Sequence, residues 1–329
     1  MKILITTPSY APHGGVRILL EIANRLAELH DVALFSLYGD RSKEYWELNP
    51  KITFSTAESL SEFDCLFITS PHTYFLTKRE DCPKKVFLSL QMLEHMFNPT
   101  DRAWAETCKE MYQSPFPMFS ISQWNIDYLK NQMKRTAETI YIGNGLNTSQ
   151  FPIEKDVEKS GKIILVEGWD AGNPCKDTEH IGPWVARKLR NEGYTILSYG
   201  REKPRVLPQV PHEFHVCPDL STLNDLYRRA TVLLKASKYD ARACAPVESF
   251  SKACVTVRAL LAGDDDLIHE YNCLRSGYNK MEMYANCKRV LRDTGLRRSL
   301  IENGYNHLDI ECNWEKWIEV IHDRISRGE

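Results

Sequence analysis

The chain has 329 residues, in which 42 Lys and Arg are balanced by 44 Asp and Glu, for a formal net charge of -2. With 43% hydrophobic residues, the composition is that of a globular protein and excludes a disordered or fibrous chain. The balanced charge lacks the basic footprint of a nucleic-acid-binding protein, although it does not exclude that class.

The 10 cysteines are scattered along the chain without a Cys-x-x-Cys pair, and we expect no secretory leader. We therefore expect free thiols and a cytoplasmic protein. No uninterrupted apolar stretch approaches the ~18 residues that a membrane-spanning helix needs. We expect a soluble chain with no integral membrane contact.

In the first half, apolar runs of strand length alternate with segments of helical period, which is typical of a parallel sheet covered by helices. The expected strands are Lys2–Thr6, Asp31–Leu37, Cys65–Thr69, Val86–Leu90, Met118–Ile121 and Thr139–Ile142. The expected helices are Val16–Leu29, Thr100–Tyr112 and Trp124–Met133. We assign residues 1–152 to one doubly wound, Rossmann-like domain.

The apolar pattern stops after Asn147, and the charged segment Glu154–Gly161 is the expected linker. The alternation then restarts. The expected strands are Ile163–Glu167, Thr195–Tyr199, Glu213–Cys217, Thr231–Lys235 and Cys254–Val257. The expected helices are Ile181–Glu192, Ser221–Arg229, Pro246–Lys252, Met281–Asp293, Leu296–His307 and Trp314–Ser326. Residues 160–312 are predicted to form a second Rossmann-like domain, and 313–329 a helix that packs back toward the first.

Two α/β domains joined by one linker predict a cleft between the carboxyl ends of two sheets. Open parallel sheets bind ligands at these ends. We therefore expect a ligand that contacts both domains, although fold alone does not fix function.

The loop after the first strand contains Gly14 and Gly15 and leads directly into a helix. Glycines at this point allow backbone N–H groups and the positive helix end to approach an anion closely. The loop matches neither Gly-x-Gly-x-x-Gly nor a Walker motif, so a glycine required only by a tight turn is equally compatible with it.

Two acidic residues, Asp240 and Glu248, stand with seven residues between them at the predicted start of a helix near Pro246. Both carboxylates can accept hydrogen bonds from sugar hydroxyls, while N–H groups of residues 244–247, Ala245 and Val247 among them, face a phosphate. The alternative is that Glu248 caps the helix and Asp240 is a solvated charge.

These two motifs resemble the family 4 retaining glycosyltransferases of the GT-B fold. Three further stretches agree with that family in the same order along the chain, namely Ser120–Trp124, Ile142–Asn147 followed by Phe151, and a helical tail with Asn303-Gly304 and Trp314-Glu315. The resemblance implies two Rossmann-like domains facing a cleft, and activity on a nucleoside-diphosphate sugar.

Residue by residue, the resemblance implies that Gly14 and Gly15 approach the donor phosphate or the acceptor and that Glu248 holds the nucleotide ribose. Asp240 stands where the family usually has Glu and is expected to bind hydroxyls of the transferred sugar. Because Asp is one methylene shorter than Glu, the sugar or its tilt can differ.

The family usually shows Gly-Arg and then Lys-Gly after the first strand of the second domain, but this chain has Gly168-Trp169 and Lys176-Asp177. Lys176 is therefore the expected main cation for the diphosphate. Arg201 or Arg242 is the expected replacement for the missing arginine. A lysine at this place is also compatible with an ordinary surface position.

Glu94 and His95 follow a strand of the first domain, where some family members that act on polysaccharides show a similar Gln and Glu before Phe. Either side chain is a candidate to position the acceptor hydroxyl and take its proton. A capping glutamate and an exposed histidine are equally compatible, and His72 is a weaker candidate.

No His-x-x-x-His or His-Glu-x-x-His motif occurs, and we expect the run Asp264–Asp266 to be solvated loop charge. The resemblance also implies a reaction without a metal ion or other cofactor. The sequence thus predicts a retaining, metal-independent glycosyltransferase whose acceptor is a glycan. Two alternatives remain, namely glycosylation of a hydroxymethylated base in DNA and a non-catalytic nucleotide- or glycan-binding protein.

Overall fold

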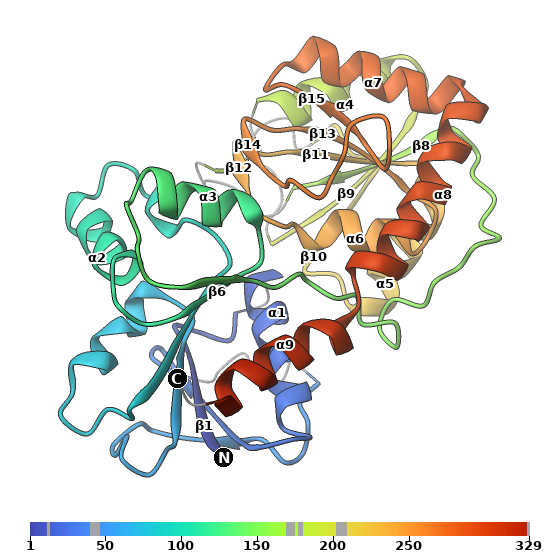
Figure 1. The fold of residues 1–329 in the computed structure, drawn as a ribbon. Helices are drawn as coiled ribbons and strands as arrows, with labels where there is room; N and C mark the ends of the chain where they lie inside the picture. Colours follow the sequence, from blue (N-terminus) through green and yellow to red (C-terminus); the bar gives the residue numbers. More distant parts are fainter. Residues whose placement is uncertain (12–13, 40–46, 169–174, 177–179, 202–208, 328–329) are drawn as a thin grey trace. The chain divides into compact units, whose positions relative to one another are not determined.

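The computed structural model describes residues 1–11, 14–39, 47–168, 175–176, 180–201 and 209–327. The chain forms two compact units (Figure 1). The first contains Met1–Asn144 and Trp314–Glu329, and the second contains Gly145–Asn313. The chain therefore passes between units before Gly145 and after Asn313, whereas the charged segment Glu154–Gly161 lies inside the second unit.

The described part of the first unit contains a seven-stranded parallel sheet with the order β3-β2-β1-β4-β5-β6-β7. Its strands are β1 (Lys2–Thr7), β2 (Asp31–Ser36), β3 (Thr53–Phe54), β4 (Cys65–Ile68), β5 (Lys85–Leu90), β6 (Met118–Ser120) and β7 (Thr139–Tyr141). Strand β4 is buried along its whole length, as an interior strand covered on both faces must be.

The helices of this unit are α1 (Gly14–Leu26), α2 (Arg102–Tyr112), α3 (Gln123–Asn131) and α9 (Trp314–Arg327), with the 3-10 helices η2 (Pro71–Lys78) and η3 (Glu94–Met96). Helix α9 buries Trp317, Ile318, Ile321 and Ile325, whose spacing forms one apolar stripe. Although last in the sequence, α9 packs against α1, with the Arg25 guanidinium 5.3 Å from the centre of the Trp314 ring (Figure 1).

The second unit, within the described residues, contains a six-stranded parallel sheet with the order β10-β9-β8-β11-β13-β15 and a short pair, β12-β14. The strands are β8 (Ile163–Glu167), β9 (Thr195–Gly200), β10 (Glu213–Val216), β11 (Val232–Ala236), β12 (Tyr239–Asp240), β13 (Val255–Ala259), β14 (Ala262–Gly263) and β15 (Leu274–Ser276). The helices are α4 (Ile181–Asn191), α5 (Leu220–Arg229), α6 (Cys244–Phe250), α7 (Lys280–Arg292) and α8 (Thr294–Glu311).

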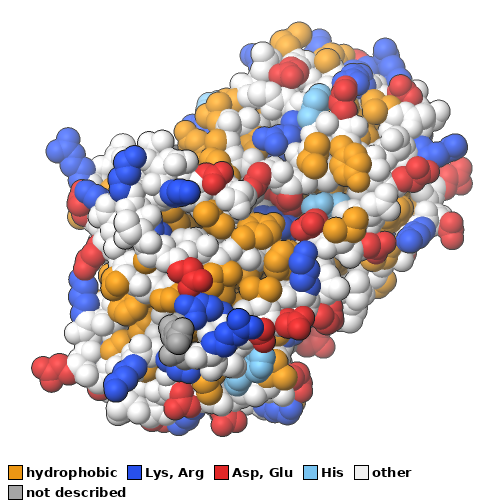
Figure 2. Space-filling view, in the orientation of Figure 1, with side chains coloured by type: hydrophobic (Ala, Val, Ile, Leu, Met, Phe, Trp, Pro, Cys, Tyr) orange, Lys and Arg blue, Asp and Glu red, His pale blue; other side chains and the backbone are white. Residues whose placement is uncertain are grey.

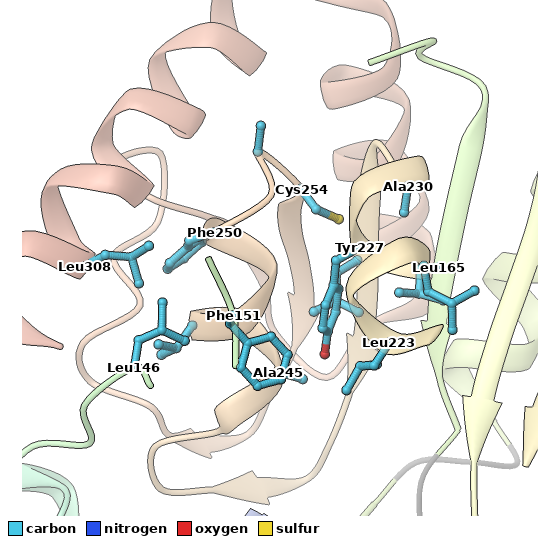
Figure 3. Close-up of a cluster of buried hydrophobic side chains, with 14 of the residues drawn as sticks. Leu146, Phe151, Leu165, Leu223, Tyr227, Ala230, Ala245, Phe250, Cys254 and Leu308 are labelled. Atoms are coloured by element: carbon cyan, nitrogen blue, oxygen red, sulfur yellow. The ribbon is translucent and has the colours of Figure 1, made fainter. Parts of the chain in front are cut away.

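A core cluster of the second unit joins α5, α6 and α8 to the chain that enters the unit (Figure 3). Leu146 and Phe151 belong to this cluster, together with Tyr227 and Phe250. Glu154 pairs with Arg228 and Lys252 of the same unit. These contacts explain why residues 145–161 fold with the second unit.

All expected strands and helices occur, with ends that shift by a few residues, so the doubly wound α/β architecture is confirmed. The short strands β3, β12, β14 and β15 were not predicted. All 10 cysteines are free thiols. In the described residues, no helix combines the length and apolar character required to cross a membrane.

The DNA alternative would require a basic surface, but several basic residues of the first unit have partners within the chain. Arg135 is buried and donates to backbone carbonyls, including that of Tyr112 at 2.7 Å. Lys78 pairs with Glu110, and Lys85 Nζ donates to the carbonyl of Ile325. On the face drawn in Figure 2, acidic and basic side chains are interspersed.

Candidate functional site

The candidate site of the second unit lies at the carboxyl end of β11. This strand is buried throughout and leads the chain to the edge of the sheet at which open parallel sheets bind ligands. The chain then forms β12, which places Asp240 beside Gly263 of β14. An isolated bridge between Lys176 and Ser237 brings Lys176 to the same place.

Asp240 lies among cations. Its Oδ2 atom is 2.8 Å from Lys176 Nζ, 3.4 Å from Lys235 Nζ and 3.5 Å from a terminal nitrogen of Arg258. Lys235 also pairs with Glu167, and Arg258 with Asp264. We call this group the ion cluster; its basic members Lys176, Lys235 and Arg258 are balanced by the acidic members Glu167, Asp240 and Asp264.

The ion cluster fixes the charge of its central groups. Burial alone would raise the pKa of Asp240, but Lys176, Lys235 and Arg258 hold this pKa far below its usual range. Burial alone would also lower the pKa of Lys176, yet the charges of Asp240 and Glu167 raise it. Lys176 and Asp240 therefore form a charged pair at neutral pH. Asp240 is not the solvated charge of the simpler interpretation.

Gly263 allows β14 to approach Asp240. It has a φ of 103°, and a Cβ atom built on it would lie 1.7 Å from the Asp240 carbonyl oxygen. Any larger residue would have to displace the backbone that carries Asp240.

We predict that Gly263→Ala lowers the free energy of unfolding by more than about 2 kcal/mol, because backbone strain and a steric clash add. The matched control is Gly193→Ala, since Gly193 has a φ of 88° but a Cβ atom added to it would meet no atom within 4 Å. Urea unfolding of both variants isolates the clash. Equal losses would show that β14 does not constrain Asp240.

Glu248 lies in α6, which begins at Cys244 rather than at the predicted Pro246. Glu248 is consequently in the second turn, and the prediction that it lies at the start of the helix was wrong. The helix can start earlier because a proline in its first turn loses no intrahelical hydrogen bond. The N-cap is Ala243, and Glu248 lies beyond the third helical position from which an acidic side chain reaches back to cap a helix.

The Glu248 side chain is buried and oriented by a tyrosine. The Tyr227 hydroxyl donates to Glu248 Oε2 at 2.9 Å, and the Tyr199 hydroxyl is 2.9 Å from that of Tyr227. Figure 3 shows Tyr227 in the core between α5 and α6. Ala245 and Val247, on the same helix, are also buried. A carboxylate held in this way is preorganised to accept a hydrogen bond from a ligand hydroxyl.

Of the two arginines considered as replacements for the missing family arginine, Arg242 pairs with an acid that is not a member of the ion cluster. Its Nε atom is 3.2 Å from Asp266 Oδ2, and its guanidinium donates to the Glu311 carbonyl. Arg242 therefore ties the loop before β15 to the end of α8. Arg201 is exposed and directly follows β9, while Trp169 and Asp177 lie outside the described residues.

The expectation that Asp264–Asp266 is solvated charge was wrong for two of the three residues. Asp264 is buried against Arg258, and its Oδ1 accepts from the backbone N–H of Ala243. Asp266 pairs with Arg242 and with His307. Although burial alone would lower the pKa of His307, its interaction with Asp266 raises this pKa to about 9. These acids neutralise buried cations, which the sequence does not reveal.

The candidate residues of the first unit lie at the carboxyl ends of β1, β4 and β5. Gly14 and Gly15 are the first residues of α1, and Gln91 Nε2 donates to the carbonyl of Gly15 at 2.8 Å. Glu94 and His95 begin η3 after β5. The structure thus places the two glycines and Glu94 at the same edge of this sheet, where the strands have their carboxyl ends.

Glu94 is held by partners from several elements. The Ser70 hydroxyl donates to Glu94 Oε2 at 3.1 Å, and the Trp104 indole donates to the Glu94 carbonyl at 3.2 Å. Burial raises the pKa of Glu94 to about 8, and the bond from Ser70 opposes this only in part. A carboxyl with this pKa can exchange a proton near neutral pH.

His95 and His72 lie close to the same group. The His95 ring nitrogen Nε2 is 3.2 Å from the Tyr128 hydroxyl, and burial lowers the pKa of His95. The His72 ring packs on Trp104, with ring centres 4.2 Å apart, and burial lowers its pKa as well. Both histidines are therefore mainly neutral at neutral pH.

We predict that Glu94→Gln raises stability increasingly as the pH rises from 5 to 8. Between the usual value of 4.5 and about 8, the unfolded chain releases the Glu94 proton while the folded chain retains it. Rising pH therefore favours unfolding of the wild type, and the substitution removes this effect. Urea unfolding at several pH values measures the difference, with exposed Glu80→Gln as control. Parallel pH profiles for wild type and Glu94→Gln would contradict the assignment.

No group of three or more His, Cys, Asp or Glu side chains in the described part of the chain is arranged to hold a metal ion. At the candidate site of the second unit, the positive charges are carried by the lysine and arginine side chains of the ion cluster.

Sequence reasoning missed Lys235, Arg258, Glu167 and Tyr227. The one available signal was position, because Glu167 and Lys235 stand at the ends of apolar runs that were predicted as strands. Arg258 and Tyr227 gave no such signal.

No known family profile matches the chain, and no curated protein matches it in sequence. The fold, however, is similar to solved structures. Sucrose-phosphate synthase from Thermosynechococcus elongatus is 14% identical with a TM-score of 0.80, over 99% of this chain and 98% of that chain. Anabaena Alr3699/HepE in complex with UDP-glucose is 14% identical with a TM-score of 0.77, over 99% and 100%.

An alpha-glucosyltransferase in complex with UDP-glucose and DNA containing an abasic site is 11% identical with a TM-score of 0.66, over 99% of both chains. These structural neighbours are GT-B glycosyltransferases. At such low identity, the similarity shows that this chain shares their fold.

Proposed function

We propose that this protein is a family 4-like retaining glycosyltransferase that moves a sugar from a nucleoside-diphosphate sugar to a hydroxyl of a glycan. The observation that carries the proposal is the Lys176–Asp240 pair at the carboxyl edge of the second sheet, with the buried Glu248 on the following helix. The shared fold, including that of neighbours solved with UDP-glucose, supports it.

In this proposal, the second unit binds the donor. Glu248 accepts hydrogen bonds from the ribose, Asp240 accepts from hydroxyls of the transferred sugar, and Lys176 binds the diphosphate. Arg201 and the backbone N–H groups of Ala245 and Val247 are further candidates for diphosphate contacts. These cationic and dipolar groups meet the negative charge that develops as the sugar–phosphate bond breaks.

The first unit is proposed to bind the acceptor. The acceptor hydroxyl oxygen forms a bond to the anomeric carbon while the bond from that carbon to the diphosphate oxygen breaks, and the diphosphate leaves with the electron pair. Attack from the face that the diphosphate leaves retains the anomeric configuration. The Glu94 carboxylate is the candidate to take the hydroxyl proton, with His95 and the backbone of Gly14 and Gly15 as positioning groups. We expect no requirement for a divalent ion, because Lys176 supplies a cation.

The proposal is tested with UDP, GDP and ADP sugars of known anomeric configuration, with and without EDTA. We expect slow release of the nucleoside diphosphate from one donor even without acceptor, unchanged by EDTA. The sugar product should show the donor's anomeric configuration by NMR. Binding without any release would instead indicate the non-catalytic alternative, and inversion would exclude the retaining mechanism.

The DNA acceptor, one of the alternatives from the sequence, is kept as a second candidate because one structural neighbour was solved with DNA. The burial of Arg135 and the contact of Lys85 with the Ile325 carbonyl weigh against a DNA surface that uses these two residues. Salt-dependent binding of duplex DNA would support this candidate, because phosphate contacts release counterions. We expect no such binding.

A further inference from the structure

The basic members of the ion cluster differ in exposure. The Lys176 side chain is 22% exposed, whereas those of Lys235 and Arg258 are 3% and 0% exposed. All three approach the same oxygen, Oδ2 of Asp240. One cation is thus at the surface of the cluster, and two are enclosed beneath it.

The enclosed cations are fixed by the sheet. β11 and β13 are adjacent parallel strands, and Lys235 and Arg258 are direct partners in their register. Two cations side by side repel each other unless an anion lies between them. Asp240 is that shared anion, since each of the two cations also has its own acid, Glu167 for Lys235 and Asp264 for Arg258.

The contacts of the Asp240 side chain involve one of its two carboxylate oxygens. Within the described part of the chain, the ion pairs with Lys176, Lys235 and Arg258 and the contact from the Ser237 hydroxyl all involve Oδ2. Oδ1 is therefore the oxygen offered to a ligand hydroxyl. Asp240 is shorter than the Glu expected from the family resemblance, and the enclosed cations hold its carboxylate close to β11 and β13.

We propose that Lys235 and Arg258 are positioning residues that retain Asp240 as a fixed anion, so that Lys176 alone transfers from Asp240 to the donor diphosphate. This inference rests on the proposed function. It adds that Lys176 exchanges one anionic partner, Asp240, for another, the donor diphosphate. When Lys176 moves to the diphosphate, Asp240 keeps two enclosed cations and stays ionised. Without them, Asp240 would retain Lys176, because a buried carboxylate left unpaired is strongly disfavoured.

The test measures binding of UDP, or of whichever of UDP, GDP and ADP the wild type binds best, by calorimetry at pH 7.5. UDP lacks the transferred sugar, so the contact of Asp240 with that sugar does not contribute. We expect Lys235→Met to weaken nucleotide binding at least tenfold although Lys176 is intact. Lys235→Arg, which keeps a cation, should bind as the wild type does, as should the exposed control Lys162→Met.

The decisive variant combines Lys235→Met with Asp240→Asn. Removing the carboxylate releases Lys176, so nucleotide affinity should return to within about threefold of the wild type, although turnover should not. A merely structural role for Lys235 predicts no such rescue. Wild-type affinity in Lys235→Met, or failure of the second substitution to restore affinity, overturns the inference.

Unfolding in urea without nucleotide tests the same inference separately from the proposed function. Lys235→Met should lower the urea midpoint clearly more than Lys176→Met, because Lys235 is enclosed and pairs with Glu167 as well as Asp240, whereas Lys176 is partly exposed. The reverse order overturns the inference even if nucleotide binds. If the wild type binds none of the three nucleotides, the proposed function fails, while the order of the midpoints still decides whether Lys235 fixes Asp240.

Discussion

Replacing Lys176 with alanine should lower turnover of the nucleotide sugar by about a hundredfold or more. The loss of one preorganised charge contact to a developing anion typically costs about 2.7 to 4 kcal/mol in the barrier. Lys176 is the one basic member of the ion cluster with substantial exposure, which makes it the member able to reach a ligand. Steady-state kinetics at saturating donor measures the effect.

The Lys176→Ala variant should remain folded, because Asp240 keeps its ion pairs with Lys235 and Arg258. The matched control is Lys162→Ala, an exposed lysine directly before β8, at the opposite edge of the same sheet. Near-normal turnover by folded Lys176→Ala would refute the assignment of the diphosphate to this lysine.

Replacing Glu248 with alanine should lower turnover by a similar factor, about a hundredfold or more, through loss of the ribose contact. A hydrogen bond to a charged group contributes about 1.5 to 3 kcal/mol, so two ribose hydroxyls account for this effect. The Tyr227 hydroxyl also loses its acceptor in Glu248→Ala. Glu248→Gln is the cleaner variant, since its amide oxygen can still accept from Tyr227 while the negative charge is removed.

The role of Glu248 is isolated by comparing donors that carry ribose with donors that carry 2′-deoxyribose. The wild type should prefer ribose, and Glu248→Gln should lose most of that preference, as measured by kcat/KM. Glu302→Gln, an exposed change on α8, serves as the control. An unchanged preference in Glu248→Gln would place the ribose elsewhere.

The parallel sheets were predictable because buried parallel strands are nearly continuous apolar runs. β8 was predicted with the observed bounds, Ile163–Glu167. By contrast, β13 was expected to end at Val257 but continues to Ala259 through Arg258. A charged residue normally marks exposure, so no local rule places a fully buried arginine inside a strand. β3 was missed because it has two exposed residues and no apolar run.

The identity of the candidate residues was partly predictable, but their contacts were not. The resemblance indicated Lys176, Asp240 and Glu248 separately. The pairing of Lys176 with Asp240 depends on the bridge between Lys176 and Ser237, which joins distant segments. The buried positions of Asp264 and Asp266 depend on Arg258 and Arg242, whose side chains lie nearby only in the folded chain.

The most direct test of the central claim is a crystal structure of the protein with the nucleoside diphosphate that binds most tightly. We predict that a diphosphate oxygen lies within hydrogen-bonding distance of Lys176 Nζ and that ribose hydroxyls contact the Glu248 carboxylate. A nucleotide bound away from both side chains, with Lys176 still paired to Asp240, would contradict the account.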